Sequence, residues 1–95
     1  MNQQKIILES LSMELRRVAL GMHRGSLAMA RRFQEEALKR EQELERSKLD
    51  SYLKKLTEKV KKTLLNKSDN HLAEDFLMYS ILFQNYTQKR FQIDN

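Results

Sequence analysis

The chain has 95 residues, a formal net charge of +5, two glycines, no proline and no cysteine. Its length fits a single domain over residues 1–95, and the lack of cysteine excludes disulfides and thiolate metal sites as sources of stability. No segment approaches the roughly 18 uninterrupted apolar residues of a membrane-spanning helix. The N-terminal residues also lack the apolar centre of a secretory signal, so we expect a soluble, cytoplasmic protein.

One apolar stripe runs through the first half of the chain. It comprises Ile7, Leu11, Leu15, Val18, Met22, Ser26, Met29, Phe33, Ala37, Arg40 and Leu44. The spacing repeats every 11 residues, close to the period of a straight α-helix. Because the stripe keeps its phase across Gly21 and Gly25, we predict one long helix over about residues 3–46. The alternative is a helix that ends at Gly21 and a second one capped by Ser26, since glycine costs a helix interior about 1 kcal/mol relative to alanine.

A second stripe follows, with a different direction. It contains Leu49, Leu53, Leu56, Val60 and Leu64. On an uninterrupted helix it would point roughly 160° away from the first stripe. Ser47 and Asp50 have the spacing of a capping box, so we predict a turn near Arg46 and a helix over about residues 47–65. The alternative is a straight helix whose two halves face different partners.

The strongest turn signal is the polar run Asn66–Asn70, and it precedes a third apolar stretch. Leu72, Phe76, Tyr79, Phe83 and Tyr86 mark a helix over about residues 70–91. Further apolar residues widen this stripe, so we expect this helix to be the most buried. The short linker predicts an antiparallel hairpin with the preceding helix. The expected fold is therefore all-α, a long helix plus a hairpin, in a three- or four-helix bundle.

The sequence shows no arrangement of residues typical of a catalytic or metal-binding site. The acidic groups Glu35–Glu36, Glu41–Glu45 and Glu74–Asp75 alternate with basic residues, so we expect them on solvated faces without a raised pKa. His23 has no second ligand at metal-binding spacing, and the acidic residues after His71 fit a helix start better than a metal site. We predict no catalytic residue, no metal ion, no cofactor and no enzymatic activity.

Positive charge gathers in residues 46–67, which hold eight basic and two acidic side chains. Two basic sets are candidates for binding an anionic partner: Arg17, Arg24 and Arg31, and Lys54, Lys55, Lys61 and Lys62. Arginine forks and lysines suit phosphate oxygens, although an ordinary solvated face is the simpler interpretation of both. Without a large apolar aromatic on the facing stripe, we expect no membrane binding.

The predicted long helix also implies a partner. A helix of roughly 40 residues would extend roughly 60 Å, too far for the remaining residues to cover its apolar stripe. We therefore expect a noncatalytic helical interaction or adaptor module that forms a homo-oligomer, with a dimer favoured, and that can bind a further protein. The predicted self-association residues are Ile7, Leu11, Leu15, Val18 and Met22. The alternative is a small basic nucleic-acid-binding protein.

Overall fold

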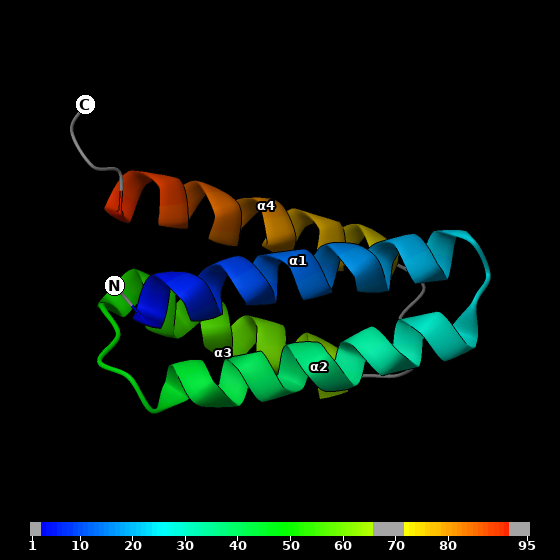
Figure 1. Cartoon of the computed structure of the whole chain (residues 1–95), viewed down its shortest axis with the longest axis horizontal. Coiled ribbons are helices and arrows are strands. Elements are labelled where there is room, and N and C mark those ends of the chain that lie inside the picture. The colour runs from blue at the N-terminus through cyan, green and yellow to red at the C-terminus, as the bar shows by residue number, and fades with distance from the viewer. Residues whose placement is uncertain (1–2, 66–71, 92–95) are drawn as a thin grey trace.

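Four helices form the chain, as the computed structural model in Figure 1 shows for residues 3–65 and 72–91. They are α1 (Gln3–His23), α2 (Leu27–Glu45), α3 (Ser51–Leu65) and α4 (Leu72–Arg90). The all-α bundle predicted from the sequence is confirmed. The predicted helix over 70–91 agrees with α4 within two residues, and the predicted end at 65 agrees with α3, but α3 begins at Ser51, four residues later than predicted.

The prediction of one helix over residues 3–46 is wrong, because the chain reverses between α1 and α2. Gly25 adopts a φ of +70°, a left-handed backbone conformation that is unfavourable for residues with a Cβ atom. The N–H of Ser26 donates to the carbonyl of Gly21 (2.9 Å), and the N–H of Gly25 donates to that of Met22 (3.1 Å). This pair of bonds is a Schellman motif, which ends a helix and satisfies its last carbonyls.

Ser26 then starts α2, as the alternative interpretation proposed. Its extended backbone and its side-chain oxygen, which accepts the N–H of Met29 at 3.3 Å, form the N-cap. The buried residues of α2 are Ala30, Ala37, Glu41 and Leu44, whereas Met29, Phe33 and Arg40 of the predicted stripe are only partly buried. Helical spacing shows which residues of each helix face inward, but it does not show whether the chain continues or reverses between two helices.

Gly21 explains how closely α1 and α2 approach. A Cβ atom at this position would lie 2.9 Å from the main-chain nitrogen of Ala30, nearer than side chains tolerate. The two helices run antiparallel side by side (Figure 1). The glycine therefore serves helix packing, and its partner is the next helix of the same chain.

The second predicted turn is confirmed between α2 and α3, so the straight-helix alternative is wrong. Asp50, rather than Ser47, is the cap: its Oδ1 accepts the N–H of Leu53 at 2.8 Å. Ser47 instead donates its hydroxyl to the carbonyl of Leu44 at 2.7 Å, at the end of α2. The predicted turn at Asn66–Asn70 lies outside the described residues.

α1 is the central helix of the bundle. It packs closely on α2 and α4. The same two helices contact α3, but less extensively. The longest dimension is 41 Å, well below the roughly 60 Å of an unbroken long helix. The fully buried side chains include Leu8, Leu11, Leu15, Val18, Ala37, Leu44, Leu53, Val60, Phe76 and Phe83.

α4 is less buried than the sequence indicated. Its inward face holds Phe76 and Phe83, and the Ser12 hydroxyl of α1 donates to the Ser80 carbonyl at 2.7 Å. Its other side remains exposed. The prediction that this helix is the most buried is wrong, because its apolar residues surround the helix and the bundle covers one side.

Candidate interaction surfaces

The stripe on α1 is covered by the chain's own helices. Leu11, Leu15 and Val18 have no exposed surface, while Ile7 and Met22 are partly buried against the core. All five predicted self-association residues therefore pack within one molecule. The premise behind that prediction, an apolar face too long to cover, fails because α2 folds back along α1.

The turn at Gly25 also divides the predicted arginine row. Arg17 lies on α1, Arg24 in the turn and Arg31 on α2. Arg17 pairs with Glu14 at 2.7 Å, and its guanidinium lies 5.4 Å from the centre of the Phe33 ring. The structure does not bring the three arginines together as one helical row.

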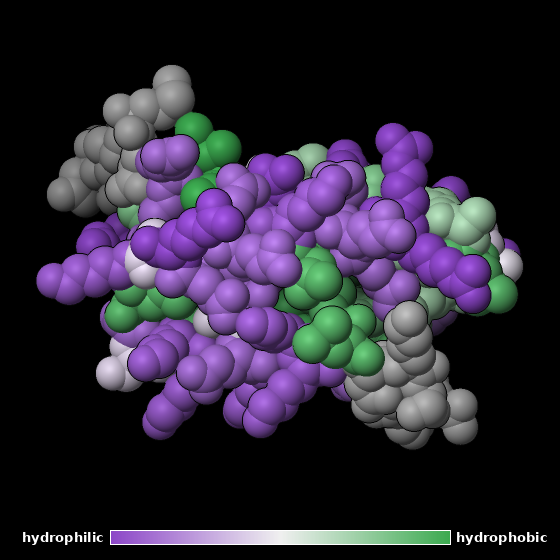
Figure 2. Space-filling model, turned by 90° about the horizontal axis from the view of Figure 1, so that it is seen from below, coloured by the Kyte–Doolittle hydropathy of each residue, from purple (hydrophilic) through white to green (hydrophobic). Residues whose placement is uncertain are grey.

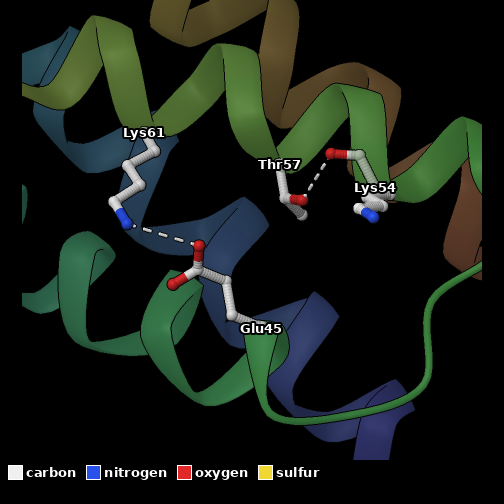
Figure 3. Close-up of polar contacts among 4 residues, drawn as sticks. All are labelled: Glu45, Lys54, Thr57 and Lys61. Atoms are coloured by element: carbon white, nitrogen blue, oxygen red, sulfur yellow. Dashed lines mark hydrogen bonds and ion pairs between the residues drawn. The ribbon is translucent and has the colours of Figure 1, made fainter.

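The predicted lysine set lies on two sides of α3. The Lys61 Nζ pairs with the Glu45 Oε1 of α2 at 3.3 Å, beside the Thr57 hydroxyl that donates to the Lys54 carbonyl at 2.9 Å (Figure 3). Lys54 lines a shallow hollow between α2 and α3 together with Glu45. Lys55 and Lys62 are exposed and lie about 100° further round the helix than Lys54 and Lys61.

The outer face of α3 consists of Tyr52, Lys55, Lys59 and Lys62, all exposed. Their spacing of three, four and three residues places them on one side of the helix. α3 contains a single acidic residue, Glu58, which lies beside this row. Sequence reasoning found these lysines but did not connect Tyr52 with them.

Tyr52 belongs to an aromatic pair at the start of α3. Its ring stacks on that of Tyr86 from α4, with centroids 5.9 Å apart and planes 18° apart. The Tyr86 hydroxyl donates to the Asp50 Oδ2 at 2.6 Å. This hydrogen bond, together with the one from the Leu53 N–H, lowers the pKa of Asp50. Burial, followed by the hydrogen bond to Asp50, raises the pKa of Tyr86 to about 12.

Glu41 departs from the expectation of solvated carboxylates, and that expectation is wrong for this residue. Its side chain on α2 is completely buried. Both carboxylate oxygens lack a hydrogen-bond partner among the described residues. Burial, followed by the neighbouring Glu45 carboxylate, raises the pKa of Glu41 to about 7 against the opposing effect of Lys61.

The outer face of α4 is apolar and uncharged from Leu77 to Gln88, and the exposed Glu74 precedes it by one turn. Leu77, Met78 and Ile81 are 38%, 46% and 47% exposed. Gln84, Asn85 and Gln88 continue the same exposed side. Residues 76–88 contain no charged side chain, although 33% of the chain is charged. By contrast, the face on the α2 side of the bundle is covered largely by hydrophilic side chains (Figure 2).

The described residues hold no group of three or more histidine and acidic side chains placed to bind a metal ion. His71, considered in the sequence for such a site, lies outside them. Within residues 3–65 and 72–91, no helix has the length and apolar character needed to cross a bilayer. Fold and surfaces together define a small all-α bundle with exposed faces of contrasting chemistry. Comparison of the chain with protein-family models, curated proteins and solved structures finds no match.

Proposed function

We propose that this chain is a noncatalytic helical interaction module that self-associates through the outer face of α4. The observation that carries the proposal is the cluster Leu77, Met78 and Ile81, which are 38–47% exposed on a segment without charge. Contiguous exposed apolar residues commonly mark binding surfaces, and the centres of such surfaces are depleted of charge.

The occupant of this face is a second copy of the chain. Each molecule carries a net charge of +5, so contact through the outer face of α3 would place lysines against lysines. The outer face of α4 avoids that repulsion. A two-fold axis would bring the same apolar cluster of two copies together, which is the usual arrangement of a homodimer.

Substitution of Ile81 by Glu tests the proposal. A carboxylate at the centre of the apolar cluster would meet its own copy across the two-fold axis and would lose water on association. We expect the parent protein to sediment as a dimer and the I81E variant to dissociate at least about 10-fold more readily, a loss of about 1.4 kcal/mol. Sedimentation equilibrium over a range of concentrations measures both.

Leu65→Glu is the matched control, since Leu65 is 59% exposed at the end of α3 and away from the proposed interface. We expect L65E to remain dimeric, and circular dichroism should show equal helix content in all three proteins. A parent protein that stays monomeric throughout, or an I81E variant that dimerises as tightly as the parent, would refute the proposal.

A further inference from the structure

An exposed aromatic ring stands at the head of a row of lysines on α3. Tyr52 is 51% exposed, and Lys55, Lys59 and Lys62 follow it along the same side of the helix. The row runs over the eleven residues from Tyr52 to Lys62, a length of roughly 15 Å along the helix. A ring and several cations along one strip match the two needs of a nucleic-acid strand, stacking for bases and positive charge for phosphates.

The ring is held in place by neighbouring groups. Tyr52 stacks on Tyr86, whose hydroxyl donates to Asp50, and Asp50 also caps the helix that carries Tyr52. One side of the Tyr52 ring faces Tyr86, while half of the residue remains accessible. A base that stacks on this residue would therefore meet an aromatic surface that is already positioned.

The lysines of the row favour an anion, while the carboxylate of Asp50, which accepts the Tyr86 hydroxyl, lies at the ring end of the row. The carboxylate of Glu45 pairs with Lys61 on the α2 side of α3, which leaves Glu58 as the acidic residue beside the outer lysines. An open hollow of about 780 Å³ lies between Tyr52 and the last two turns of α4, and the stacked Tyr86 also lines it. Its lining includes Asn85, Gln88, Lys89 and Arg90.

We propose that the outer face of α3 binds single-stranded nucleic acid, with a base stacked on Tyr52 and phosphates contacted by Lys55, Lys59 and Lys62. An unpaired strand fits better than a duplex because the paired bases of a duplex cannot stack on a protein ring. It fits better than a membrane because the exposed apolar side chains on this side of α3 are Tyr52 and Leu65, at opposite ends of the row, which is too little apolar surface to insert. The proposal is independent of self-association through α4.

Fluorescence anisotropy with a labelled oligothymidylate provides the test. Three phosphate contacts predict that log K falls with log salt concentration with a slope of about −2. Tyr52→Ala should weaken binding roughly 5- to 150-fold, the range for one base stacked on an aromatic ring, whereas Tyr52→Phe should retain it. Lys59→Gln should make the salt slope shallower by about 0.7, the contribution of one phosphate contact on a single strand.

Lys39→Gln is the matched control for Lys59, because Lys39 is an exposed lysine on α2. It should leave both affinity and salt slope unchanged. Parent-like binding by both Y52A and K59Q, tighter binding of the corresponding duplex, or binding of anionic phospholipid vesicles but not of the oligonucleotide would each overturn the proposal. The I81E variant should bind the oligonucleotide through the same face, which separates this result from the test of self-association.

Discussion

Among the described residues, Glu41 is the only charged side chain that is completely buried. The carboxylate lacks a hydrogen-bond partner in its ionised form within this part of the chain, so ionisation is unfavourable inside the bundle. The protonated form can share a hydrogen bond with Glu45, which also raises the pKa. Glu41 thus links the stability of the bundle to protonation.

The stability of the fold should therefore depend on pH in a defined direction. The pKa of Glu41 rises from 4.5 to about 7 on folding, so the folded state binds more protons between these values. The contribution of Glu41 is most favourable below pH 4.5 and is lost as the pH rises through 7. Glu41→Gln removes this charge and should stabilise the protein at pH 8 by up to about 3 kcal/mol.

Urea unfolding at several pH values measures this effect. The difference between the parent protein and E41Q should shrink as the pH falls from 8 to 5, while Glu35→Gln, at an exposed position of the same helix, should leave the pH dependence unchanged. A difference that is independent of pH would contradict the linkage to Glu41.

At the scale of the elements, the α1–α2 hairpin depends on its two glycines for different reasons. Gly21 lies inside α1, where alanine has the better helix propensity by about 1 kcal/mol. A Cβ atom there would nevertheless lie 2.9 Å from the backbone of Ala30, which cannot move without shifting α2. Gly25 has open space around it and is needed for its positive φ.

Gly21→Ala should therefore destabilise the protein in spite of its higher helix propensity. We expect a net loss of about 1–3 kcal/mol, typical of an overpacked core, measured by chemical denaturation followed by circular dichroism. Gly25→Ala should cost about 1–2 kcal/mol through backbone strain alone. A G21A variant more stable than the parent would show that α2 is not packed as closely as described.

At the scale of the whole molecule, α1 packs against its neighbouring helices more extensively than α3 does. α1 approaches the backbones of both α2 and α4, through small residues such as Gly21, Ala30 and Ser12. α3 contacts its neighbours less extensively and turns a lysine-rich side to solvent. Fewer buried contacts lower the free energy needed to open a segment.

Native-state hydrogen exchange should reveal this difference. We expect the slowest amides in the middle of α1, around Leu11 and Leu15, and faster exchange along α3. Only hydrogen-bonded amides in the middle of each helix are compared, because amides at helix ends exchange rapidly in any helix. Equal protection of α1 and α3 would mean that the bundle opens only as a single unit.

The sequence by itself determined the all-α class, the turn before α3 and the approximate limits of α3 and α4. Apolar spacing and capping residues are local signals, and they were sufficient for these features. Glu41 shows the limit of such signals. From Ala37, a step of four residues followed by one of three reaches Glu41 and then Leu44, whereas the predicted apolar stripe takes the step of three first and reaches Arg40. Both orders keep a helical period, and neither identifies the buried carboxylate.

Only the tertiary structure decided the reversal at Gly25, the burial of Leu11, Leu15 and Val18 within one molecule, and the exposure of Leu77, Met78 and Ile81. It also placed Tyr86 beside Tyr52, two residues from different helices. The physical reason is that periodicity reports which residues avoid water, whereas the neighbour that excludes the water is set by how the helices pack. A stripe covered by its own chain and one that awaits a second copy have the same local pattern.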